Sequence, residues 1–85
     1  MQEVCEGFER LNITATNTTI KTGTLLGIFV SSTSAGTLKV ADGDGTIANT
    51  FSPAAATFYR LPCRFKGTLT VTVGGTLDAT IFYKL

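Results

Sequence analysis

The sequence contains no histidine and no tryptophan, and only 15% of its 85 residues are charged. Without histidine, the chain has neither the usual general base nor the usual neutral metal ligand, and no Ser–His or Cys–His nucleophile can form. P-loop, dinucleotide-binding and nucleophile-elbow motifs are also missing from the sequence. We therefore predict a protein that is not an enzyme, with no catalytic residues, no cofactor and no metal site.

An excess of charge of either sign is also lacking. Seven lysines and arginines oppose six acidic residues, which gives a formal net charge of +1. The longest apolar run, residues 25–30, is far shorter than the ~20 residues that a helix needs to cross a bilayer. The first ten residues contain three glutamates and lack the pattern of a signal peptide. We expect no nucleic-acid or membrane partner, and synthesis in a cytoplasm that keeps Cys5 and Cys63 reduced.

Threonine and glycine are abundant instead, with sixteen and nine copies. Threonine favours strands, and from residue 11 onward runs with a period of two replace the helical pattern, with residues 24–31 as a nearly continuous apolar stretch typical of a strand buried on both faces. Strands are predicted at residues 11–15, 18–22, 24–31, 37–41, 46–51, 57–61, 63–66, 68–73 and 76–85. About eight short strands predict an all-β protein, a small antiparallel β-sandwich or jelly-roll-like domain over residues 12–85.

Turn signals separate these predicted strands. Residues 42–45, Asp-Gly-Asp-Gly, are a strong turn signal, and residues 32–36 predict a second turn. Residues 74–75, Gly-Gly, predict a tight hairpin. Pro62 predicts the end of a strand or a bulge. In the last two strands, alternation predicts an inward face made of Leu69, Val71, Val73, Leu77, Ala79, Ile81, Tyr83 and Leu85.

Residues 1–11 differ from the rest of the chain. Met1, Val4, Cys5, Phe8 and Leu11 follow the spacing of one helical face. The pattern predicts a short amphipathic helix or arm that precedes the β-domain. Three turns are too short to be stable alone, so the apolar stripe must dock on its own sheet or on a neighbouring subunit.

Two binding patterns need an explicit interpretation. Asp42 and Asp44 are the closest carboxylate pair, but the residues that follow do not match an EF-hand loop. The alternatives are a solvated β-turn and a loose calcium site. Residues 58–66 interleave aromatic and basic side chains, as in a platform that stacks single-stranded bases. Alternation, however, places Tyr59 on the face opposite Phe58, so at least one of these aromatic rings belongs to the core.

The low charge has two physical interpretations. Either a soluble domain uses threonine at its outward positions, or the outward faces are covered in an assembly. Exposed strand edges usually carry lysine or proline, yet residues 68–73 have neither. Such a strand would be protected if it paired in an oligomer.

Several segments together resemble a known family: residues 23–30 (GTLLGIFV), 36–40 (GTLKV), 46–50 (TIANT) and 69–83 (LTVTVGGTLDATIFY). They resemble small structural proteins of tailed bacteriophages that decorate or cement the capsid, over residues 19–85. The resemblance implies a homo-oligomeric β-sandwich, most simply a trimer. It also implies a place in the virion, on the outer capsid surface, where the protein bridges major capsid protein subunits and stabilises the shell. No catalytic residues are implied.

Three groups of residues are predicted to face a partner. They are the N-terminal stripe Val4, Phe8 and Leu11; the uncharged strand positions Thr68, Thr70 and Thr72; and the cations Arg60, Arg64 and Lys66, which could pair with acidic capsid loops. Each group also has a purely structural interpretation within the chain. Two other functions remain open: a tail, fibre or spike module for host-surface adhesion, and a small nucleic-acid-binding β-barrel.

Overall fold

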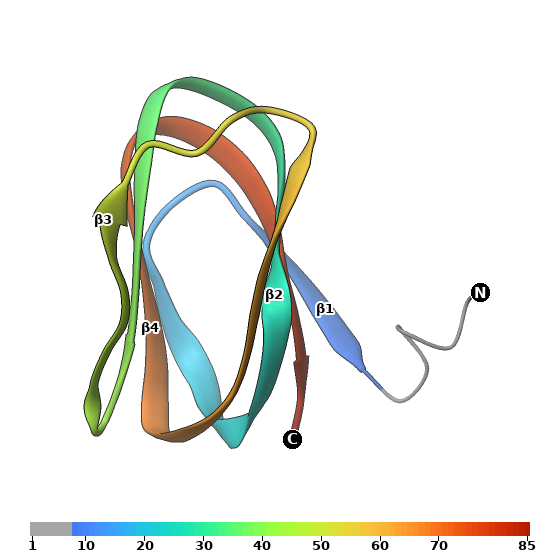
Figure 1. Ribbon diagram of the computed structural model, residues 1–85, viewed down its shortest axis with the longest axis vertical. Coiled ribbons are helices and arrows are strands. Elements are labelled where there is room, and N and C mark those ends of the chain that lie inside the picture. The colour runs from blue at the N-terminus through green and yellow to red at the C-terminus, as the bar shows by residue number, and fades with distance from the viewer. Residues whose placement is uncertain (1–7) are drawn as a thin grey trace.

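The computed structural model describes residues 8–85, which form four β-strands and no helix (Figure 1). These are β1 (Glu9–Ile13), β2 (Asn17–Asp42), β3 (Gly45–Phe51) and β4 (Thr57–Lys84). They form one sheet in the order β1-β4-β2-β3, and every neighbouring pair is antiparallel. The prediction of an all-β antiparallel protein is confirmed. Within residues 8–85, no helix is present that could span a membrane.

The number of strands differs from the prediction, because two long strands replace most of the short ones. β2 runs through the predicted strands at 18–22, 24–31 and 37–41, and β4 runs through the four predicted strands between residues 57 and 85. The predicted turn at 32–36 and the predicted hairpin at 74–75 are therefore wrong. The segments on either side of residues 74–75 do not pair with each other, because both pair with β2.

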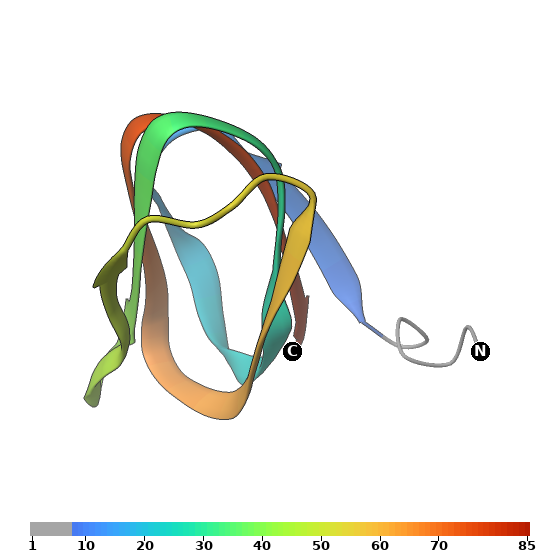
Figure 2. The same ribbon diagram turned by 45° about the horizontal axis from the view of Figure 1, so that its top comes forward.

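The turn-forming residues bend the long strands at two corners and do not reverse them (Figure 2). At one corner Thr22, with a φ of 32°, lies beside Gly67, with a φ of 69°. The Gly67 N–H donates a hydrogen bond to Thr22 Oγ1 over 3.2 Å. At the other corner Ala35, with a φ of 58°, lies against Gly75, with a φ of 69°. A single left-handed residue redirects a strand sharply, and because both strands bend together, their pairing continues past the corner.

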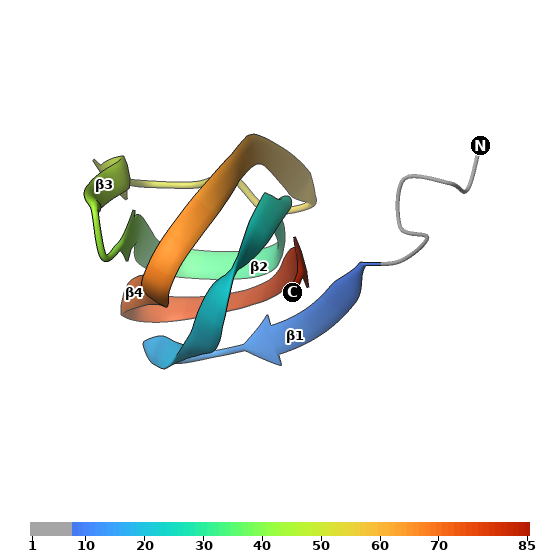
Figure 3. The same cartoon turned by 90° about the horizontal axis from the view of Figure 1, so that it is seen from below.

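The bends let β2 and β4 pair with each other twice and enclose the core (Figure 3). Residues 24–30 of β2 have residues 57–64 of β4 on one side and residues 79–84 on the other. The inner face of the bent sheet carries one apolar cluster of thirteen buried residues: Ile13, Ile20, Leu25, Ile28, Val30, Leu38, Val40, Phe65, Leu69, Val71, Leu77, Ala79 and Ile81. Most of the predicted inward face is confirmed, but Leu85 is 72% exposed.

The N-terminal helix is not confirmed. Residues 9–11, the last part of the predicted helix, belong to β1, and residues 1–7 lie outside the described part of the chain. β1 pairs in register with the end of β4, with Leu11 opposite Ile81 and Ile13 opposite Ala79. The free edge of β4 offers hydrogen-bonding partners and an apolar surface, and these outweigh a short helical pattern.

The predicted turn at residues 42–45 is confirmed, and the Asp42 carboxylate organises it. Asp42 Oδ1 accepts hydrogen bonds from the backbone N–H groups of Asp44 (3.0 Å) and Gly45 (3.1 Å). Asp42 Oδ2 accepts one from the N–H of Lys66 on β4 (2.9 Å), and the Gly43 N–H donates back to the Lys66 carbonyl (2.7 Å). These donors, Lys66 above all, lower the pKa of Asp42 below its usual 3.8.

Candidate interaction face

Alternation along β2 and β4 separates an inner from an outer face of the sheet. Ile28 and Val30 are fully buried in the core, so Phe29 between them projects outward, where it is half-buried. In the same way, Ile81 is fully buried and the half-buried Phe82 projects outward. Directly paired residues project to the same side of a sheet, so the pairing register identifies neighbours on the outer face.

Two rows of outward side chains cross β4, β2, the second arm of β4 and β1. The first row is Arg60, Gly27, Phe82 and Arg10, and the second is Phe58, Phe29, Thr80 and Asn12. We call the residues Arg10, Phe29, Phe58, Arg60 and Phe82 the outer aromatic–cationic face. It gathers side chains from three strands that are up to 72 positions apart in the sequence.

Gly27 lies at the centre of this face and makes room for an aromatic pair. A Cβ atom at Gly27 would lie 2.6 Å from the Phe58 ring, and it would also meet the Tyr59 carbonyl. The Phe58 ring therefore covers the glycine and contacts Phe82 edge-to-face, with ring centroids 6.1 Å apart. This is the arrangement in which an aromatic ring compensates for a missing side chain in a sheet. Phe58 remains 39% exposed.

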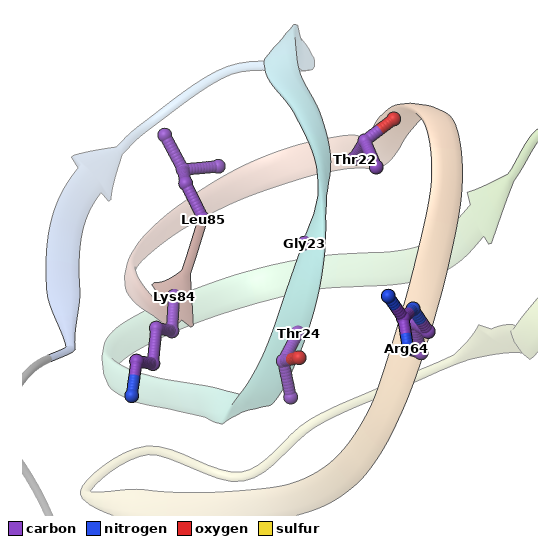
Figure 4. Close-up of a pocket in the computed structure, with 6 residues that line it drawn as sticks. All are labelled: Thr22, Gly23, Thr24, Arg64, Lys84 and Leu85. Atoms are coloured by element: carbon purple, nitrogen blue, oxygen red, sulfur yellow. The ribbon is translucent and has the colours of Figure 1, made fainter.

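Cations border the aromatic pair. Arg10 and Arg60 are exposed and occupy opposite ends of the row through Gly27. One row further along, Thr24 is paired with both Arg64 and Lys84. These two cations line a shallow hollow of about 350 Å³, together with Thr22, Gly23, Thr24 and Leu85 (Figure 4). The outer surface of this half of the sheet is therefore cationic around an apolar centre.

A hydrogen-bonded asparagine fixes β1, and with it Arg10, at the edge of this face. Asn12 Nδ2 lies 2.7 Å from Asp78 Oδ1, 3.0 Å from the Ala79 carbonyl and 3.2 Å from Thr80 Oγ1. The first of these contacts ties the Asp78 carboxylate to Asn12. The short strand β1 is thus held by side-chain contacts as well as by its five paired residues.

The three cations predicted to face a partner, Arg60, Arg64 and Lys66, do not lie together in the structure. Arg60 and Arg64 lie on the same outward side of β4. On this side either an acidic capsid loop or a nucleic-acid strand could contact them. Lys66 lies beyond them at the corner, and its Nζ is 3.8 Å from Asp44 Oδ2. The Asp42 carboxylate accepts hydrogen bonds from backbone N–H groups, and Asp44 lies beside Lys66, as expected for the β-turn interpretation of this segment. No group of three metal-ligating side chains occurs within residues 8–85.

The uncharged segment at residues 68–73 is not an edge of the sheet. Val71 is paired with Val40 on one side and with Asn17 on the other, both from β2. The expectation that this strand needs an oligomer to pair is therefore wrong, because the bend in β2 supplies both neighbours. Thr68 and Thr70 are half-buried and Thr72 is exposed, all on the outward side opposite Leu69 and Val71.

The N-terminal stripe is only partly visible. Phe8 is half-buried just before β1, and Leu11 packs against the core cluster of its own chain. Val4 lies outside the described residues. Leu11 therefore follows the structural interpretation, in which the stripe docks on its own sheet.

Cys63 and Pro62 mark a local irregularity in β4. The register between Leu25 and Gly27 of β2 shifts opposite residues 60–63, which confirms the predicted bulge at Pro62. Cys63 packs against the core cluster, and burial together with the negative charge of Asp42 raises the pKa of its thiol. A raised pKa leaves less thiolate at neutral pH and makes Cys63 a poor nucleophile.

Sequence reasoning identified Phe58 and Arg60 but missed Arg10, Phe29 and Phe82 as parts of one surface. A signal for Phe82 was present, because alternation places it opposite the inward Ile81, and an outward phenylalanine is a candidate contact residue. Phe29 was hidden within an apolar run, and Arg10 within the helical pattern.

Comparison with protein-family models, with curated proteins and with solved structures finds no match for this chain. The function of the outer aromatic–cationic face is therefore argued from its own residues and their physical chemistry.

Proposed function

We propose that the protein is a viral structural protein that decorates or cements the outer surface of a bacteriophage capsid, where it bridges major capsid protein subunits. The sequence resemblance to capsid decoration proteins suggests this role. The observation that carries it is the outer aromatic–cationic face, a cluster of three outward phenylalanines bordered by arginines.

The composition of this face supports docking onto another protein. Aromatic residues and arginine are enriched at the centres of protein interfaces, and a few of them usually provide most of the binding energy. Among the three phenylalanines of the face, Phe58 is the most exposed, at 39%. Its ring is held in place by Phe82. An aromatic ring that is already ordered loses little conformational entropy when a partner covers it.

The sheet edges support the proposal that the protein assembles as a homo-oligomer, which the resemblance implies is a trimer. β3 is an edge strand with β2 as its one neighbour in the sheet. Residues 45–59, which include β3, carry no charge. Charged residues normally discourage pairing at a bare edge, and the opposite edge strand β1 has Glu9 and Arg10. An uncharged edge is suited to pairing with a second copy. The β-sandwich that the resemblance implies is part of the same proposal, and the two bends of the sheet are consistent with it.

In this role the protein would stabilise the shell by mass action. A protein that binds the assembled shell and not its separated subunits stabilises the shell by RT ln(1 + [L]/Kd) at each site. Repetition of the sites over the lattice, and several copies in one oligomer, make weak individual contacts multivalent. No chemical step is required.

The test is to add the purified protein to capsid shells of the phage that encodes it and to measure occupancy by cryo-electron microscopy. We expect density at fixed positions on the outer surface, and we expect Phe58→Ser to lose it. Ser32→Ala, a change of an exposed side chain outside the face, is the matched control and should retain occupancy. Shells that stay bare with the unmodified protein would rule the function out.

A further inference from the structure

We propose that the outer aromatic–cationic face recognises an extended acidic polypeptide segment in which an apolar side chain lies between two carboxylates. This inference rests on the proposed function and specifies the partner surface for it. It is carried by the charges of the face and by the spacing of its two arginines.

The distribution of charge selects an anionic partner. Four of the seven cations of the chain lie on this side of the sheet: Arg60 and Arg10 at the ends of the row through Gly27 and Phe82, and Arg64 and Lys84 in the next row, beside Thr24. Within residues 8–85 none of the four forms an ion pair, since the one pair found there joins Lys66 to Asp44. The carboxylate of Asp78 accepts a hydrogen bond from Asn12. The face therefore has positive charge that its own strands do not neutralise.

The aromatic geometry favours a polypeptide over a single nucleic-acid strand. A base-stacking platform presents the flat faces of successive rings to solvent. Here Phe58 and Phe82 meet edge-to-face at 68°, and Phe29 and Phe82 are half-buried. The exposed surface is the single ring of Phe58, which covers Gly27 and lies beside the half-buried Phe82, and it suits one apolar side chain better than a series of stacked bases.

The spacing of the arginines predicts the sequence pattern of the partner. Arg60 and Arg10 stand at the ends of a row that crosses four adjacent strand segments, so their backbones are three strand spacings, roughly 14 Å, apart. In an extended segment, residues four positions apart are separated by about 13 Å and project to the same side. Two carboxylates at positions i and i+4 would reach the two guanidinium groups, and an apolar residue at i+2 would lie against the exposed Phe58 ring, which covers Gly27. Arginine binds carboxylates through two parallel hydrogen bonds, which adds directional specificity.

The experiment measures binding of a fluorescein-labelled nonapeptide by fluorescence anisotropy. The peptide has glutamate at its third and seventh positions, phenylalanine at its fifth, and glycine or serine elsewhere. We expect saturable binding that weakens several-fold between ~50 and ~300 mM salt, as for exposed ion pairs. Replacing both glutamates by glutamine, or placing them side by side, should lower the affinity about tenfold.

Charge reversal locates the site. Arg60→Glu and Arg10→Glu, made singly, should each lower the affinity of the peptide about tenfold. Lys21→Glu is the matched control, because it makes the same change of charge at an exposed cation outside the face, and it should leave affinity within about twofold. Thermal unfolding of each variant verifies that it folds, and the glutamine peptide tests the same contact with the unmodified protein.

Two outcomes would overturn this inference. One is equal binding of the glutamate and glutamine peptides, and the other is tighter binding of a twelve-nucleotide thymidine strand than of the acidic peptide. Neither outcome decides the decoration role, which shell occupancy tests separately. A protein that occupies shells through Phe58 but ignores charge would retain the proposed function and lose the acidic partner.

Discussion

Phe65 and Phe58 lie seven residues apart on β4 and occupy opposite faces of the sheet. Phe65 is fully buried among the apolar residues of the core, whereas Phe58 is 39% exposed and covers a glycine on the outside. Phe58 is paired with the outward Phe29 of β2, whereas Phe65 follows the outward Arg64, so alternation places the two rings on opposite faces. The comparison shows that the same residue type is fully buried on one face of the sheet and exposed on the other, where we propose that it serves recognition. The following predictions test how complete that separation is.

Phe65→Ala should have the largest effect on stability. The substitution leaves a cavity in the core and should lower the free energy of unfolding by about 3–5 kcal/mol. Urea denaturation followed by circular dichroism measures it, and Phe65→Leu should lose clearly less. A loss below ~1 kcal/mol for Phe65→Ala would show that the core tolerates the cavity by rearranging.

Gly27→Ala should have the next largest effect on stability, because Gly27 lies against both the backbone of β4 and the Phe58 ring of the outer face. A methyl group there meets the Tyr59 carbonyl and the Phe58 ring, and such overpacking usually costs about 1–3 kcal/mol of unfolding free energy. Peptide or shell binding should weaken as well, because the Phe58 ring has to move. Ser32→Ala, at an exposed β2 position, is the control. An unchanged protein would show that the ring swings away without cost.

Phe58→Ser should separate recognition from stability. The lost edge-to-face contact with Phe82 is worth about 0.5–1.5 kcal/mol, which sets the expected loss of unfolding free energy. Binding to shells should fall to the background level. If stability fell as much as for Phe65→Ala, the outer face would be part of the structural core and the comparison would fail.

Asp42→Asn should have the smallest effect, and the effect should depend on pH. The pKa of Asp42 is lower in the folded chain than its usual 3.8, so the carboxylate stabilises the fold above pH ~4 and this contribution is lost as the pH falls through the lowered pKa. The urea midpoints of the two proteins should therefore differ at pH 7 and converge once the pH falls below the lowered pKa of Asp42. Midpoints that remain equally far apart at low pH would assign the effect to geometry and not to charge.

Local sequence signals predicted the fold well wherever residues act through their near neighbours. The turn at residues 42–45 forms because Asp42 reaches backbone N–H groups two and three positions away. Pro62 produces a bulge because it has no N–H to donate. Alternation identified Leu69, Val71, Leu77, Ala79 and Ile81 as inward residues, and all five are buried.

The predictions failed where the outcome depended on distant partners. Gly75 signals positive φ, but whether that produces a hairpin or a bend depends on the strand that lies alongside, and here Ala35 on β2 bends with it. Residues 9–11 match a helical stripe, yet they pair with the free edge of β4. For the same reason the sequence placed Phe58 and Arg60 on one side of a strand but could not bring Phe29, Phe82 and Arg10 next to them.

The sequence by itself determined that this is a β protein of low charge, with no histidine, whose alternating residues assign each side chain to an inner or an outer face. Those properties follow from composition and from the period of two, which are local. Only the tertiary structure decided that two bent strands pair twice, that residues 68–73 are covered within the chain, and that three phenylalanines and two arginines form one outer surface. These facts depend on which segments become neighbours, and neighbours are chosen by the free energy of the whole packed sheet, not by any short stretch of sequence.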